Sequence, residues 1–243
     1  MNAAYDLDKI KFATDGPTLR RAFDLYNHGK VTQFGREPGS FTAIVLGGQP
    51  YRVSVSTKHF DQGYCNCYLG ENDTLCKHMV AVAICAVMDA KPLTAKDKQI
   101  NDQPVSSGQL GKLNKTAETN LKKSVTTIIQ KYIKAYEGPS RIWFRYQNRL
   151  EEGCNRLAAL VSELPVSEQT AALLITMLLS LDKKLSTGGV DDSNGTVGGF
   201  MEEVVLVLKQ YTELDPSCIK ALKQLNNQET CFGWEEPLVQ LLK

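Results

Sequence analysis

Four residues with metal-binding side chains lie within fourteen positions of this chain. Cys65 and Cys67 are separated by one residue, eight residues follow, and Cys76 and His78 are again separated by one residue. Zinc prefers thiolate and imidazole ligands, and four protein ligands fill its tetrahedral shell, as in structural rather than catalytic zinc sites. Eight residues are enough for the chain to reverse direction, so the pattern predicts a small fold built around one structural zinc ion.

Three other interpretations of these residues compete with zinc. Small buried cysteines are common in protein cores, although Cys65 and Cys67 lie among polar residues. A nucleophilic pair formed by Cys76 and His78 would need an orienting third group and an oxyanion site, neither of which the sequence identifies. A disulfide between Cys65 and Cys67 would close a strained ring. We favour zinc and keep the other three as alternatives.

The sequence around this cluster resembles the SWIM zinc finger family. The resemblance rests on CNCYLGENDTLCKHMVAVAI, and upstream on a short helix ending near HGKV and on strands around FTAIVLG and YRVSVS. The resemblance covers roughly residues 18–90. The chain as a whole is similar to stand-alone bacterial SWIM proteins that carry a helical C-terminal region. The resemblance implies a DNA- or protein-interaction module. It also implies these zinc ligands: Cys65, Cys67, Cys76 and His78.

The first ninety residues predict a small α+β domain. Apolar residues at helical spacing predict a short helix over 18–28, which Gly29 ends. Alternating and β-rich stretches, separated by turn residues, predict an antiparallel β-meander with strands at 31–37, 40–46 and 51–56. An apolar helix is then expected over 76–88. The predicted fold is an α+β zinc-finger domain, made of a short helix, an antiparallel β-meander, the zinc site and a helix.

The remaining sequence predicts an all-α helical domain. Residues 91–115 are rich in Lys, Asp, Gln, Ser, Gly and Pro, which indicates a linker. Beyond the linker, apolar periodicity predicts helices over 116–136, 140–164, 167–185, 196–211 and 216–226, with a short tail at 235–242. We therefore expect a zinc-binding domain at 1–90, a linker at 91–115 and an α-helical domain at 116–243.

Charge is distributed unevenly along the chain. Residues 91–150 carry twelve Lys and Arg against four Asp and Glu, whereas residues 151–243 carry seven against fourteen. In the basic strip, residues 112–149, aromatic side chains interleave with cations, a combination that suits phosphate contact and base stacking. The possible nucleic-acid-binding residues are Lys122, Lys123, Lys131, Lys134, Arg141, Arg145 and Arg149. The alternative is a solvated helix face, with its aromatic residues in the core or paired with the acidic C-terminal third.

Composition excludes several classes of protein. With 42% hydrophobic and 23% charged residues, the chain is expected to fold around a packed core rather than to be disordered. Its longest charge-free apolar stretch, 169–181, is shorter than the roughly 18 residues that a membrane span needs. The first twenty residues contain no recognisable secretory signal, and seven cysteines fit a reducing compartment. We expect a cytoplasmic protein without membrane contact.

The function predicted from these features is a non-enzymatic, zinc-binding interaction module or adaptor, in which structural zinc stabilises a protein- or nucleic-acid-docking domain. Of these two kinds of partner, we expect a protein. The first alternative is a DNA- or RNA-binding accessory factor that uses the basic strip. The second is an enzyme or enzyme subunit with an unrecognised site in the helical domain. The sequence contains no P-loop, dinucleotide fingerprint or nucleophile elbow, and it does not fix the oligomeric state.

Overall fold

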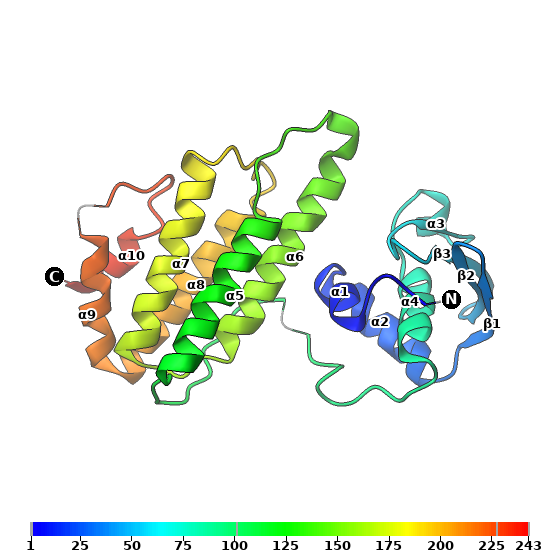
Figure 1. Ribbon diagram of the computed structural model, residues 1–243, viewed down its shortest axis with the longest axis horizontal. Coiled ribbons are helices and arrows are strands. Elements are labelled where there is room, and N and C mark those ends of the chain that lie inside the picture. Colours follow the sequence, from blue (N-terminus) through cyan, green and yellow to red (C-terminus); the bar gives the residue numbers. More distant parts are fainter. Residues whose placement is uncertain (1, 101, 227, 243) are drawn as a thin grey trace. The chain divides into compact units, whose positions relative to one another are not determined.

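The computed structural model describes residues 2–100, 102–226 and 228–242, except for the side chain of Arg141. The chain divides into two compact units, residues 1–100 and residues 101–243 (Figure 1). The first unit combines an antiparallel sheet with helices, and the second is helical. The predicted fold class, an α+β zinc-finger domain followed by an all-α domain, is confirmed. None of the described helices is long and apolar enough to cross a membrane.

The first unit is built on a four-stranded antiparallel sheet in the order β1-β2-β3-β4. Its strands are β1 (Val31–Glu37), β2 (Ser40–Leu46), β3 (Pro50–Ser56) and β4 (Gly63–Cys65). Alternate residues of the middle strands are buried on one face, as Phe41, Val45 and Val55 show. The predicted meander is confirmed for its three strands, and β4 is added to it by pairing of Cys65 with Val53.

Helix α4 (Lys77–Met88) fills the centre of the first unit. Eight of its twelve residues are buried, because one side packs on the sheet and another on α2 (Gly16–Asn27). Helix α2 begins at Asp15, whose carboxylate accepts a hydrogen bond from the N–H of Thr18 at 2.9 Å. It is followed by Gly29, whose φ of +62° suits the end of a helix. A short helix, α1 (Leu7–Phe12), also contacts α4.

The second unit places its helices around one hydrophobic core. Its longer helices are α5 (Lys115–Tyr132), α6 (Trp143–Ser162), α7 (Glu168–Ser186) and α8 (Thr196–Leu214). Its short helices are η1 (Ser140–Ile142), η2 (Pro216–Cys218), α9 (Ile219–Leu222), η3 (Lys223–Leu225), α10 (Glu236–Val239) and η4 (Gln240–Leu242). The predicted helical segments are therefore present, with the segment around residue 216 divided into three short turns.

The start of α8 is fixed by a residue that precedes the helix. The N-cap residue is Gly195, with a φ of +73°. The carboxylate of Asp192 accepts hydrogen bonds from the backbone N–H groups of Val197 and Gly198, both at 2.8 Å. Asp192 thus satisfies two N–H groups in the first turn from outside the helix, a role that spacing alone does not reveal.

The segment predicted as a linker, 91–115, is divided between the two units. Leu93 is buried in the core of the first unit. Farther along, the N–H of Val105 donates to Ser162 Oγ at 3.1 Å, and Leu110 forms an isolated parallel bridge with Val166. The domain boundaries predicted at residues 90 and 116 stay a prediction.

Candidate metal centre

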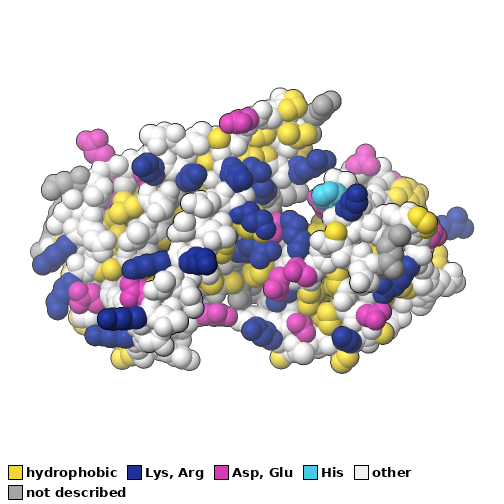
Figure 2. Space-filling view, viewed as in Figure 1, with side chains coloured by type: hydrophobic (Ala, Val, Ile, Leu, Met, Phe, Trp, Pro, Cys, Tyr) yellow, Lys and Arg dark blue, Asp and Glu magenta, His cyan; other side chains and the backbone are white. Residues whose placement is uncertain are grey.

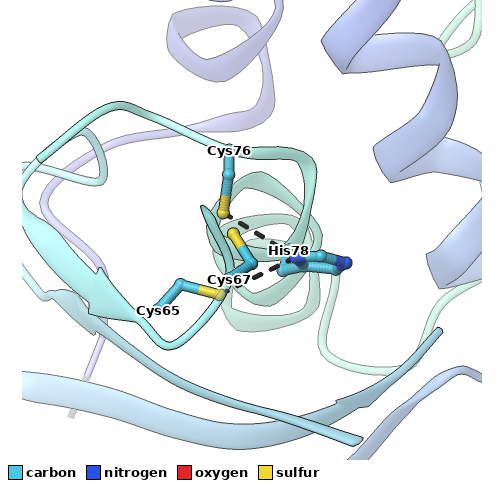
Figure 3. A group of neighbouring side chains, drawn as sticks. All are labelled: Cys65, Cys67, Cys76 and His78. Atoms are coloured by element: carbon cyan, nitrogen blue, oxygen red, sulfur yellow. Dashed lines mark hydrogen bonds between the residues drawn. The ribbon is translucent and has the colours of Figure 1, made fainter. Parts of the chain in front are cut away.

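The four residues of the Cys/His cluster converge at the N-terminal end of α4 (Figure 3). Cys65 ends β4, and Cys67 is the N-cap of α3 (Tyr68–Glu71). Cys76 is the N-cap of α4, and His78 lies in the first turn of that helix. The ligand atoms of all four side chains lie within 4.8 Å of one another. The structure therefore brings together the residues that the sequence pattern singled out.

The geometry of this cluster fits a tetrahedral zinc ion. His78 Nδ1 lies 3.7 Å from Cys65 Sγ and 3.9 Å from Cys76 Sγ. Tetrahedral zinc with Zn–S bonds of about 2.3 Å and Zn–N bonds of about 2.0 Å has S···N edges of about 3.5 Å. Three sulfurs and one nitrogen are also the donor set that zinc prefers. The site is consistent with one structural zinc ion held by protein ligands alone.

Close packing of β4 against α3 sets the positions of the first two cysteines. The N–H of Gly70 donates to Cys67 Sγ at 3.4 Å. A Cβ atom at residue 70 would lie 2.2 Å from the carbonyl oxygen of Cys65, so a larger residue does not fit there. Asn66 continues the contact with β3, since its Oδ1 accepts from the N–H of Arg52 at 2.8 Å. Gly70 was not predicted from the sequence, where its only signal is a glycine three residues after a ligand.

The imidazole of His78 is held by an aromatic neighbour. Its ring stacks on the ring of Tyr51, with centroids 4.1 Å apart and planes inclined by 22°. His78 is 4% exposed, and its Nε2 has no hydrogen-bond partner in the described part of the chain. Nδ1 is therefore the nitrogen presented to the sulfurs. Tyr51 was predicted only as a strand residue, because no spacing rule connects it with the ligands.

The electrostatics of the site favour a thiolate at Cys76. The pKa of Cys76 is lowered to about 4, first by the hydrogen bond from Cys65 and further by those from His78 and the backbone N–H of Met79, against the effect of burial. The pKa of Cys65 is raised, because its thiol holds the shared proton and because burial disfavours a second thiolate. Thiols that bind zinc lose their protons, so one ligand is already prepared for the metal.

The residues of the basic strip are not equally exposed. Lys122, Lys123, Lys131, Lys134 and Arg145 are exposed, and Figure 2 shows Lys and Arg side chains gathered over α5 and α6. Arg149 is half-buried, with its guanidinium 5.3 Å from the centroid of the Tyr146 ring. Arg141 lies in η1, before α6 begins, and its side chain is outside the described part. Arg145 and Arg149 lie within α6, about one helical turn apart.

Most aromatic residues of the basic strip are turned away from solvent. Tyr132 and Tyr146 are each 6% exposed and belong to the core of the second unit. Trp143 donates its Nε1–H to Asp191 at 3.0 Å, and the hydroxyl of Tyr136 donates to the carbonyl of Pro139 at 2.7 Å. Phe144, at 75% exposed, is the one interleaved aromatic residue that lies open. This arrangement favours the solvated-face alternative, while nucleic-acid binding by the strip stays a prediction.

Comparison with known proteins identifies the same segment. Residues 51–86 match the SWIM zinc finger family, a non-catalytic structural type of domain. The match begins in β3 and ends in α4, so it includes Tyr51 and the whole ligand cluster. No curated protein and no solved structure matches the chain. The chain therefore contains a SWIM zinc finger at residues 51–86, whose Cys/Cys/Cys/His cluster is consistent with one structural zinc ion.

Proposed function

We propose that this protein is a non-enzymatic, zinc-stabilised interaction module, in which Cys65, Cys67, Cys76 and His78 bind one structural zinc ion. The observation that supports it is the closed set of four ligand atoms within 4.8 Å of one another, contributed by β4 and by the starts of α3 and α4. Structural zinc supplies folding free energy on the order of 10 kcal/mol. Four protein ligands leave no position for a reacting water molecule, so the metal organises a surface.

The surface beside the ligands is suited to a protein partner. Tyr64, Tyr68 and Leu69 flank the first two cysteines, and their side chains are 53%, 81% and 43% exposed. Exposed aromatic residues next to a rigid centre are typical of interface anchors. Residues 1–90 also contain equal numbers of acidic and basic residues, so net charge gives this unit no preference for nucleic acid. The proposed role is therefore that of an adaptor that docks a protein through the finger.

Two double variants separate zinc binding from docking. Elemental analysis of the untagged protein is expected to give about one zinc per chain, which Cys65→Ser/Cys67→Ser loses. Tyr64→Ser/Tyr68→Ser is expected to retain zinc and to lose the partners that wild type captures. A well-folded wild type without zinc would contradict the metal assignment. Unchanged capture by the tyrosine variant would contradict the docking surface alone.

A second candidate is a nucleic-acid-binding accessory factor that uses the basic strip. The observation in its favour is that Phe144, largely exposed, adjoins the exposed Arg145 at the start of α6. Fluorescence anisotropy with a labelled single-stranded oligonucleotide, repeated at several salt concentrations, tests it. The variant Arg145→Ala/Arg149→Ala is expected to weaken binding and to reduce the salt slope by about one for each phosphate that it no longer neutralises. An unchanged slope would leave the strip as a solvated face.

An enzymatic role for the helical unit receives less support. Acid–base or nucleophilic chemistry needs several ionisable groups that converge in a pocket. A groove between α5 and α7 has an aliphatic floor, and lysine is the only ionisable residue type among the described residues that line it. None of the seven cysteines, all of which lie in the described part of the chain, forms a disulfide, as expected for the proposed cytoplasmic location.

A further inference from the structure

A groove of about 680 Å³ lies within the second unit, between α5 and α7. Its floor is aliphatic and is formed by α5, α6 and α7, as represented by Leu121, Val125, Ile129, Leu160, Leu173 and Met177. Thr126, Gln130, Thr176 and Ser180 line its mouth and are exposed. The volume is in the range of small-molecule sites, and the floor has neither an aromatic ring nor a polar side chain. Such a floor suits an alkyl chain better than a sugar or a nucleotide.

Contacts beyond both ends of the groove limit its length. Near one end, Gln169 Nε2 donates to Glu118 Oε2 at 2.8 Å, and near the other, the N–H of Tyr136 donates to the carbonyl of Gly189 at 3.0 Å. The stretch of α5 along the groove, residues 121–130, rises by about 14 Å. An extended chain advances about 1.2 Å per backbone bond, so roughly a dozen carbons fill this length. These contacts disfavour a long peptide that would continue past either end.

Charge in the lining is positive and is concentrated at one end. Lys183 and Lys184, in the last turn of α7, form none of the ion pairs found among the described residues. At the opposite end, Lys122 is paired with Glu118 at 2.6 Å. Among the described residues, no Asp or Glu lines the groove. The groove thus combines an aliphatic floor with available cations at the C-terminal end of α7. This combination is complementary to an amphipathic anion.

We propose that this groove binds a linear aliphatic carboxylate of about twelve carbons. The alkyl chain would lie on the aliphatic floor, and the carboxylate would meet Lys183 and Lys184, where charge-assisted hydrogen bonds form. The site lies wholly in the second unit and uses no residue of the zinc finger. It therefore goes beyond the adaptor role, and failure of either proposal leaves the other intact.

Calorimetric titration of the full-length, zinc-loaded protein tests the site. The probes are decanoate, dodecanoate, tetradecanoate and hexadecanoate, each below its micelle concentration, with dodecanol as the neutral counterpart. One saturable site is expected, and affinity rises about fourfold per methylene until the groove is filled and then levels off. Dodecanol is expected to bind about tenfold more weakly than dodecanoate, because it makes no charge-assisted contact.

Variants locate the bound molecule. Lys183→Gln/Lys184→Gln is expected to lower dodecanoate affinity about tenfold and to leave dodecanol affinity unchanged. Lys209→Gln/Lys223→Gln is the matched control, since both lysines lie outside the groove, and it is expected to bind both probes like wild type. Thr176→Trp places an indole in the mouth and is expected to abolish binding of every probe, with circular dichroism checking the fold.

Three results would overturn the proposal. The first is no saturable binding of any carboxylate to wild type. The second is equal dodecanoate affinity in the Lys183/Lys184 variant, and the third is binding retained by a folded Thr176→Trp protein. If the carboxylates fail and an amphipathic peptide flanked by glutamates binds instead, the groove is a helix-docking site.

Discussion

The imidazole of His78 lies against the phenol ring of Tyr51, with ring centroids 4.1 Å apart. Tyr51 comes from β3, whereas His78 comes from the first turn of α4, so the stacking joins the sheet to the helix at the metal cluster. It fixes the plane of the imidazole with Nδ1 near the sulfurs of Cys65 and Cys76. A residue outside the Cys/His signature thus orients one of its ligands.

Tyr51→Ala is expected to weaken zinc binding about tenfold, because groups that orient a metal ligand typically contribute at least this much to affinity. Tyr51→Phe keeps the stacked ring and is expected to bind zinc like wild type. Competition with a chromophoric chelator measures both affinities. Equal affinities for the Ala variant and wild type would show that the stacking does not orient His78.

Gly70→Ala is expected to disrupt the zinc site without altering any ligand. The new Cβ atom would lie 2.2 Å from the Cys65 carbonyl oxygen and 2.6 Å from Cys65 Cβ, so β4 and α3 must separate. Gly48→Ala is the control, because nothing lies within 4 Å of a Cβ atom at that position. Zinc content and thermal unfolding are measured for both variants, and only Gly70→Ala is expected to lose zinc and stability. A zinc-loaded Gly70→Ala protein of normal stability would refute it.

Removal of zinc is expected to unfold the first unit and to leave the second folded. The metal cluster belongs to the first unit, whereas both tryptophans, Trp143 and Trp234, belong to the second. Tryptophan fluorescence should therefore stay unchanged after chelation, while amide hydrogen exchange increases throughout α4 and the sheet. Loss of tryptophan signal on chelation would contradict this independence.

Asp182→Ala is expected to destabilise the second unit by about 3 kcal/mol, because two donors lose their shared acceptor. Asp182 is 8% exposed, and its Oδ1 accepts from the N–H of Cys231 and from Trp234 Nε1, both at 2.9 Å. Asp182→Asn retains an oxygen acceptor and should lower the stability of the second unit by less. Urea unfolding followed by tryptophan fluorescence measures both losses of stability. Equal losses would show that the negative charge of Asp182 contributes more than the presence of an acceptor oxygen.

Alkaline pH is expected to destabilise the second unit through Tyr211. Burial raises the pKa of Tyr211 to about 12, whereas an unfolded tyrosine has a pKa of about 10. Between these values the unfolded state binds fewer protons than the folded state, so the free energy of unfolding falls as pH rises. The free energy of unfolding of Tyr211→Phe should fall less steeply with pH over this range, as measured by urea unfolding at several pH values. If wild type and Tyr211→Phe lose stability equally steeply with pH, Tyr211 is not a source of the alkaline destabilisation.

Regular spacing made part of this fold predictable. Alternation in β3 and the apolar run of α4 gave their boundaries to within one residue, because burial on one side of a strand or throughout a helix leaves a repeating pattern. The metal cluster was predictable for a related reason, since few other uses explain four such ligands at close spacing. Each of these features is encoded by neighbours in the sequence.

Features that depend on tertiary contacts were not predictable. Strand β4 and helices α1 and α3 have three to six residues each, too few to show a period. The functions of Tyr51 and Gly70 depend on what lies opposite them in space. The basic strip illustrates the same limit, because composition could not show that Tyr132 and Tyr146 are buried while Phe144 is exposed.

Cys67 and Cys76 each stand at the start of a separate helix, and this has a consequence for protein engineering. The turn that connects the two helices contributes no ligand, and Asp73 within it is exposed. Additional residues inserted at this turn would lengthen the connection while both sulfurs stay anchored by their own helix starts. The number of residues between Cys67 and Cys76 can therefore vary without loss of the ligand geometry. Asp73 is a suitable place to insert a peptide tag.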